Sequence, residues 1–255
     1  MKVLAAIALA AVAYAQPLQY DVTFLNGSYA YRISGIAIDP IYGSSTAIAE
    51  AGRLTADGAG NVNGADTVIV AGSLVRRTFV GTYSINPDGT GAFVLNPSWG
   101  PQIHADFVAG EHGKLLTLVI TDSGNTLSGA MEVQQPATPL TGGYNYNLAG
   151  TAMDFYGNVT PIREIGHLVS DGAGNLTGTS TVSINGSIVR RTLTGTYTMN
   201  PDGTGSATLY PSWGPPIDVD LFVSANGVKV EFVVTDSGST LSGSMVTDTL
   251  PSERM

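Results

Sequence analysis

Apolar and polar residues alternate with a period of two along most of this chain, in short runs separated by turn-forming residues. In the run 188–199, for example, one face is rich in threonine and the other is mainly apolar, with Val189, Arg191, Leu193, Gly195, Tyr197 and Met199. Such alternation is typical of antiparallel strands with one buried face. Asp-Gly and Ala-Gly pairs between the runs favour tight hairpin turns, because these residues tolerate a positive φ.

The alternation predicts eight strands in the first half of the chain, near residues 28–38, 45–55, 60–69, 73–85, 90–96, 103–109, 114–121 and 126–133. We find no convincing amphipathic helix between them. Eight short strands joined by hairpins favour an up-and-down meander that closes into a barrel, which also removes exposed strand edges. A β-sandwich is the alternative, although it usually needs longer Greek-key connections. The expected fold class is therefore all-β.

The second half of the chain repeats the first. Residues 52–131 align without a gap to residues 166–245, and more than half of the aligned residues are identical. The repeat length of about 115 residues matches a domain rather than a solenoid unit, which has about 20–50 residues. We therefore expect two tandem eight-stranded barrels. The predicted divisions are a first barrel at 16–134, a Pro-bearing linker at 135–141, a second barrel at 142–248 and a tail at 249–255.

Short motifs in both copies resemble a class of exported repeat domains found in soil bacteria such as acidobacteria. In the first copy they are Gly27-Ser28-Tyr29, the segment 52–61, Gly81-Thr82-Tyr83 and the segment 87–91. The Gly-x-Tyr strands and the strand count are also distantly similar to the calycin barrels, the lipocalins and avidins. A Tyr stands at residue 29, where calycins usually have Trp, and no calycin ligand contact is carried over. The resemblance implies a barrel architecture.

The first 15 residues predict a secretory signal peptide, with one lysine, a short apolar core and an Ala-Tyr-Ala end before Gln16. The apolar core is shorter than the roughly 20 residues that span a bilayer, so we expect no membrane span and a secreted, extracellular or periplasmic protein. The chain contains no cysteine, which excludes disulfides and thiolate metal sites. A net charge of −9 argues against a nucleic-acid partner.

An arginine falls on the apolar face of the same strand in each copy, Arg77 in the first and Arg191 in the second. A buried guanidinium requires a partner. Strand parity places Asp122 and its copy Asp236 on inner faces as well, so we expect an inward Arg–Asp pair in each barrel. Such a pair is either a structural closure of the barrel end or a polar anchor in an apolar ligand cavity.

Aromatic residues complete the candidate binding set. Trp99 and Trp213 are the only tryptophans and lie in matching Pro-Ser-Trp-Gly-Pro segments, where they suit either a stacking platform or a plug over the barrel. The expected ligand-binding residues are Arg77, Tyr83, Trp99, Asp122, Arg191, Tyr197, Trp213 and Asp236. The histidines are not shared between the copies, and the acidic turn 57–66 keeps only half of its side-chain oxygen ligands in the second copy, where Thr177 and Ser180 replace Asn63 and Asp66. We therefore expect no metal site and no cofactor.

Three functions remain open from the sequence. The first is a non-enzymatic protein that binds a small apolar or carbohydrate-like ligand in or at the mouth of each barrel. The second is a structural or adhesive surface protein with solid barrels, because an eight-stranded barrel can be either filled or just wide enough for one ligand. The third is an enzyme, which a raised carboxyl pKa inside a cavity would support. A cavity of roughly 300 Å³ or more would favour the binding function.

Overall fold

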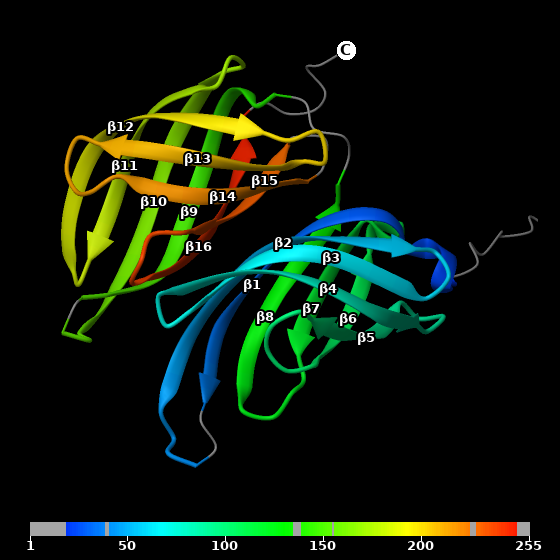
Figure 1. Ribbon diagram of the computed structural model, residues 1–255. Coiled ribbons are helices and arrows are strands. Elements are labelled where there is room, and N and C mark those ends of the chain that lie inside the picture. Colours follow the sequence, from blue (N-terminus) through cyan, green and yellow to red (C-terminus); the bar gives the residue numbers. More distant parts are fainter. Residues whose placement is uncertain (1–18, 39–40, 135–138, 155, 225–227, 249–255) are drawn as a thin grey trace, which may run out of the picture.

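The protein folds into two closed antiparallel β-barrels of eight strands each (Figure 1). The computed structural model describes residues 19–38, 41–134, 139–154, 156–224 and 228–248. The first barrel contains β1 (Asn26–Ile38), β2 (Ser45–Asp57), β3 (Asn61–Val70), β4 (Ser73–Ile85), β5 (Thr90–Pro97), β6 (Ile103–Gly110), β7 (Leu115–Ile120) and β8 (Asn125–Val133). Each strand pairs with the next, and β8 closes the barrel on β1.

The second barrel repeats this order. It contains β9 (Thr141–Met153), β10 (Val159–Asp171), β11 (Asn175–Ile184), β12 (Ser187–Met199), β13 (Thr204–Pro211), β14 (Ile217–Ser224), β15 (Lys229–Val234) and β16 (Ser239–Thr247), and β16 closes on β9. The predicted all-β class and the two tandem up-and-down barrels are confirmed, and the sandwich alternative is wrong. The predicted signal peptide, most of the predicted linker and the predicted tail lie outside the described residues.

Two-residue hairpin turns set the register of the strands. Ala71 and Gly72 join β3 to β4 with φ values of 49° and 77°, and Asn185 and Gly186 make the same turn in the second barrel with 47° and 83°. Two successive positive φ values match the right-handed twist of a hairpin. The turn makes Val70 face Ser73 and fixes every later pair along these strands.

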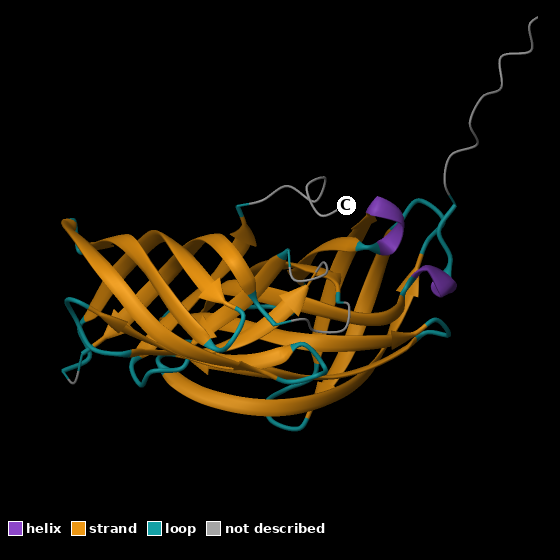
Figure 2. Ribbon diagram, turned by 90° about the horizontal axis from the view of Figure 1, so that it is seen from above, coloured by secondary structure: helices purple, strands orange, loops and turns teal. Residues whose placement is uncertain are grey.

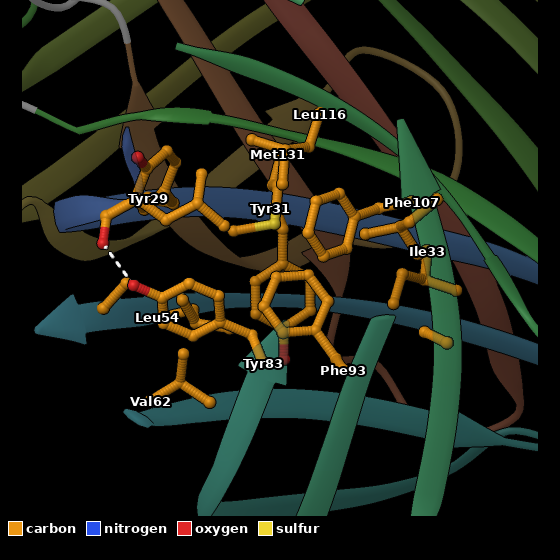
Figure 3. Close-up of a cluster of buried hydrophobic side chains, with 14 of the residues drawn as sticks. Tyr29, Tyr31, Ile33, Leu54, Val62, Tyr83, Phe93, Phe107, Leu116 and Met131 are labelled. Atoms are coloured by element: carbon orange, nitrogen blue, oxygen red, sulfur yellow. Dashed lines mark hydrogen bonds between the residues drawn. The ribbon is translucent and has the colours of Figure 1, made fainter. Parts of the chain in front are cut away.

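Inward-facing side chains form one core in each barrel. In the first barrel, Tyr29, Tyr31, Tyr83, Phe93 and Phe107 project into the interior (Figure 3), and the rings of Phe93 and Phe107 lie 4.7 Å apart. Two short 3₁₀ helices, η1 (Val22–Phe24) and η2 (Glu111–Gly113), lie at one end of this barrel (Figure 2).

That end of the first barrel is closed. Leu25, directly after η1, is 1% exposed, and its carbonyl accepts a hydrogen bond from the Tyr83 hydroxyl at 2.9 Å. Leu140 does the same in the second barrel, where its carbonyl accepts from the Tyr197 hydroxyl at 2.8 Å. Each barrel is therefore sealed at this end by the segment that leads into its first strand.

The two barrels pack against each other through different faces. The outer face of β1–β3 contributes Ala30, Ala49, Ala51 and Ile69, and the outer face of β14–β15 contributes Phe222 and Val233; all six are buried. Around this apolar centre, Arg32 pairs with Glu231 at 3.0 Å and Arg76 pairs with Asp220 at 2.9 Å. Small alanine side chains allow the two sheets to approach closely, and the ion pairs fix their orientation.

Candidate functional site

The first barrel contains a cavity of about 530 Å³ that we call the first-barrel cavity. Its walls are mainly apolar side chains from all strands of the barrel, such as Ile48, Leu54, Phe93, Leu118 and Leu127. It reaches the end of the barrel opposite to η1, where residues of the β5–β6 and β7–β8 connections, 99–102 and 122–123, line it. The cavity is thus sealed at one end and bounded by loops at the other.

The second barrel is almost completely filled. Its interior cavity measures about 40 Å³ and is lined by strand residues alone. Val219 and Phe232 project into it at the positions where the first barrel has the smaller Ala105 and Leu118. This volume has room for a few water molecules and is far below the roughly 300 Å³ of a typical ligand site. The two copies share a fold but differ in what their interiors can hold.

A cluster of polar side chains lies in the wall of the first-barrel cavity. The Arg77 Nε donates to the two Asp66 carboxylate oxygens at 2.9 and 3.2 Å, and Arg77 Nη2 donates to Glu50 Oε2 at 3.1 Å. The Tyr31 hydroxyl lies 2.9 Å from Glu50 Oε1 and 3.0 Å from Asp66 Oδ2. All four residues are buried, and Tyr31, Glu50 and Arg77 line the cavity.

Strand register brings these groups together. Asp66 on β3 lies directly opposite Arg77 on β4, and both point inward with their apolar neighbours. Glu50 points inward from β2 and Tyr31 from β1. The Tyr31 ring and the Asp66 side chain pack directly against Gly52. A Cβ at residue 52 would lie 2.7 Å from each of them, so a larger residue does not fit there. The cluster therefore depends on a glycine in β2 as well as on its charged members.

Burial raises the pKa of Glu50 to about 8, and the neighbouring Asp66 carboxylate adds to this effect more than the Arg77 cation offsets it. Burial lowers the pKa of Arg77, but the facing Glu50 and Asp66 carboxylates outweigh burial and raise it overall. Burial, followed by the same two carboxylates, also raises the pKa of Tyr31. At neutral pH the cluster therefore holds an Arg77–Asp66 ion pair beside a protonated Glu50.

The second barrel has a simpler version of this cluster. Arg191 Nη2 donates to Glu164 Oε2 at 2.8 Å, and Arg191 Nε donates to Ser180 Oγ at 3.2 Å. The Tyr146 hydroxyl donates to Glu164 at 2.7 Å. Ser180 stands where the first copy has Asp66, so this cluster has one carboxyl group for one guanidinium.

The expected pairing of Arg77 with Asp122 is wrong. Asp122 lies at the loop-bounded end of the cavity, where it accepts from the His104 backbone N–H at 2.9 Å and contacts His104 Nδ1 at 2.7 Å. Asp236 accepts from the Asp218 N–H in the same way. Asp122 and Asp236 lie just after the ends of β7 and β15, whereas the guanidinium groups are held by Glu50 and Asp66 in the first barrel and by Glu164 in the second.

The aromatic candidates lie at opposite ends of the barrels. Trp99 is 51% exposed and lines the rim of the first-barrel cavity, and Trp213 is 53% exposed in the matching segment. Their carbonyls accept from Arg77 Nη1 at 3.3 Å and from Arg191 Nη1 at 3.1 Å. Tyr83 and Tyr197, by contrast, bind the closed ends and line neither cavity. Arg77, Trp99 and Asp122 are therefore the predicted residues that line the first-barrel cavity.

Sequence reasoning missed Glu50 and Asp66, although a signal for both was present. Each lies on the same face of its strand as the inward-facing apolar residues. The two-residue turn at 71–72 pairs residue 70 with residue 73, so residue 66 must pair with residue 77. Among the described residues, no group of three or more His, Asp or Glu side chains is arranged to hold a metal ion. The described part of the chain also has no apolar helix of membrane-spanning length.

No protein-family model matches this chain, and no curated protein matches it in sequence. Solved structures with a related arrangement include a Nitrosomonas europaea protein assigned as AttH, at 8% identity and a TM-score of 0.29, covering 88% of this chain and 93% of that one. Another is the isotype 1 transferrin binding protein B of serogroup B Neisseria meningitidis, at 6% identity and a TM-score of 0.37, covering 86% of this chain and 74% of that one. Structural likeness at this level does not indicate a shared function.

Proposed function

We propose that this protein is an exported, non-enzymatic binding protein whose first barrel holds one small, largely apolar molecule. The observation that carries the proposal is the first-barrel cavity of about 530 Å³. Ligand sites in proteins are typically cavities of about 300–1,000 Å³ with mainly apolar walls and a few convergent polar groups. The cavity fits this description, with apolar strands around the Glu50–Arg77 cluster. Export is proposed from the predicted signal peptide.

The second barrel supports a different role for its interior. A cavity of about 40 Å³ is far smaller than the roughly 300 Å³ at which ligand sites begin, so we do not place a second interior site there. We propose that this barrel is a solid body that covers the outer face of β1–β3 and so stabilises the hollow barrel. A carbohydrate-like ligand would bind at a rim, where the exposed Trp99 ring offers a stacking surface.

Binding is tested with N-phenyl-1-naphthylamine, a neutral apolar dye whose fluorescence rises in apolar surroundings. We expect one dye per chain for the wild-type protein. Ala105→Phe places a phenyl ring in the cavity from β6 and is expected to weaken binding strongly, because Ala105 lines the cavity. Val119→Phe is the matched control, because Val119 is 46% exposed on the outside of the neighbouring strand. No binding by the wild-type protein, or equal binding by the Ala105→Phe variant, would contradict the proposal.

The same protein, purified from its own source, is then examined by native mass spectrometry. A retained small molecule that is displaced by the dye would identify the natural ligand. A retained oligosaccharide that the dye does not displace would move the site to the rim at Trp99. If the native mass equals that of the protein alone after gentle purification, the dye measurements are the only support for binding.

A second candidate function is acid–base catalysis by Glu50. Its pKa of about 8 supports this function, because a carboxyl group that titrates near neutral pH can both donate and accept a proton. Catalysis requires that the retained molecule is converted, whereas a binding protein returns it unchanged. Conversion that stops in the Glu50→Gln variant while dye binding persists would favour the enzyme.

A further inference from the structure

The hollow barrel carries one acidic group more than the filled barrel at the same place in the fold. Around Arg77 there are two carboxyl groups, Glu50 and Asp66, whereas around Arg191 there is only Glu164, with Ser180 in place of the second acid. The other members of the two clusters, the tyrosine and the tryptophan carbonyl, are the same. Both barrels therefore have the cluster, but the second acid is present in the barrel that has the large cavity.

The Arg77 guanidinium is not free to bind an anionic ligand. Its Nε is held by Asp66, its Nη2 by Glu50 and its Nη1 by the Trp99 carbonyl. An incoming carboxylate or phosphate would face two acids and would have to displace one of them from the guanidinium. Because desolvated like charges repel strongly, the cluster disfavours an anion.

Glu50 and Asp66 can, however, balance one positive charge more than that of Arg77. With both carboxyl groups ionised, the cluster has a net charge of −1, and a cation beside Glu50 would neutralise it without breaking an existing contact of Arg77. Glu50 lines the cavity, so its carboxyl group is within reach of a molecule inside. In the absence of such a cation, a proton on Glu50 performs this neutralisation.

We infer that the first-barrel cavity selects molecules with a single cationic group, such as a primary ammonium, on an apolar body, and that Glu50 holds the cation while Asp66 pairs with Arg77. This inference rests on the proposed function and names its ligand class. The surroundings agree with it, because Asp122 lines the rim of the cavity and the whole chain has a net charge of −9. An acidic rim and a negative protein raise the local concentration of cations.

The test uses three probes with one apolar body and different head groups: decylammonium, 1-decanol and decanoate. Each displaces N-phenyl-1-naphthylamine from the wild-type protein at pH 7 and low salt. We expect decylammonium to bind most tightly, 1-decanol more weakly and decanoate most weakly. Equal affinities of the three probes, or tightest binding of decanoate, would overturn the inference. Failure of the dye and of all three probes to bind would instead overturn the proposed function itself.

Asp66→Ser reproduces in the hollow barrel the arrangement that surrounds Arg191. We expect this variant to lose roughly 30-fold in decylammonium affinity, as for the loss of one partner from a buried charge pair, while its 1-decanol affinity stays within about threefold. Ser180→Asp is the matched control and should leave both affinities unchanged, because the second barrel has no room for a probe. An Asp66→Ser variant that is folded by circular dichroism and still prefers decylammonium would refute the role of the second acid.

Discussion

Replacing the same glutamate in the two barrels should have opposite effects on stability. Glu50 and Glu164 occupy matched positions on β2 and β10, and each accepts a hydrogen bond from an arginine. In the first barrel, Glu50→Gln leaves Arg77 paired with Asp66 at 2.9 Å. In the second barrel, Glu164→Gln leaves Arg191 as a buried cation beside a serine. The first change removes a surplus acid, and the second removes a required one.

The magnitude for Glu50 follows from its pKa of about 8 in the folded protein, against an ordinary value of 4.5. A tenfold change in proton affinity corresponds to about 1.4 kcal/mol, so ionising Glu50 inside the barrel costs on the order of 4–5 kcal/mol. Because the folded-state pKa is raised, the protonated group costs nothing below pH 4.5, and the cost accumulates as pH rises from about 4.5 to about 8.

The free energy of unfolding is measured by urea denaturation at pH 5, 7 and 9, followed by circular dichroism. We expect Glu50→Gln to match the wild-type protein at pH 5 and to exceed its stability by several kcal/mol at pH 9, since glutamine carries no charge at either pH. Glu164→Gln should be less stable than the wild type by about 3–5 kcal/mol at pH 7, the usual cost of breaking a buried ion pair. A Glu50→Gln variant that is destabilised at pH 9 as strongly as Glu164→Gln would refute this reasoning.

Three further substitutions test other parts of the structure. Arg77→Met should lower the free energy of unfolding by about 3–5 kcal/mol at pH 8 and by less at pH 5, because protonation neutralises the two acids that lose their cation. Urea denaturation at both pH values checks this, and an equal loss at the two pH values would contradict it. Tyr83→Phe removes the hydroxyl that donates to the Leu25 carbonyl and should cost about 1–2 kcal/mol in the same assay, with an unchanged dye affinity as its contrast to Ala105→Phe. Asp220→Ala removes the acceptor of Arg76 at the interface of the barrels and should separate a single unfolding transition into two; a single transition at unchanged urea concentration would show that the apolar centre alone couples the barrels.

Strand alternation was sufficient to predict the fold because the barrels are built from simple hairpins. Every predicted strand of the first half overlaps a strand of the structure, and the inward position of Arg77 followed from the same parity. Parity alone did not identify the partner of Arg77, because it places acids on several strands inward without showing which of them lies beside the guanidinium. The counting rule of the turn at 71–72 leads from Arg77 to Asp66 directly.

Other features of the site were beyond the reach of the sequence. The difference between a cavity of about 530 Å³ and one of about 40 Å³ arises from small changes in side-chain size on interior positions, some of which point in opposite directions. Leu118 becomes the larger Phe232, for instance, while Phe93 becomes the smaller Ala207. Only the packed arrangement decides how such exchanges combine. The contact between the two barrels was equally hidden, since it joins outward residues that are far apart in the sequence.

The two barrels contact each other through different faces, so the same contact could in principle be repeated by further barrels. A head-to-tail contact between similar units can be repeated by a third unit, a fourth and so on, as in a growing fibre. The outer face of β10–β11 corresponds to the face of β2–β3 that forms this contact, and there Arg163 and Ser183 replace the buried Ala49 and Ile69. A long charged side chain at the centre of this face disfavours a repeat of the same contact, because an unpaired buried cation is costly.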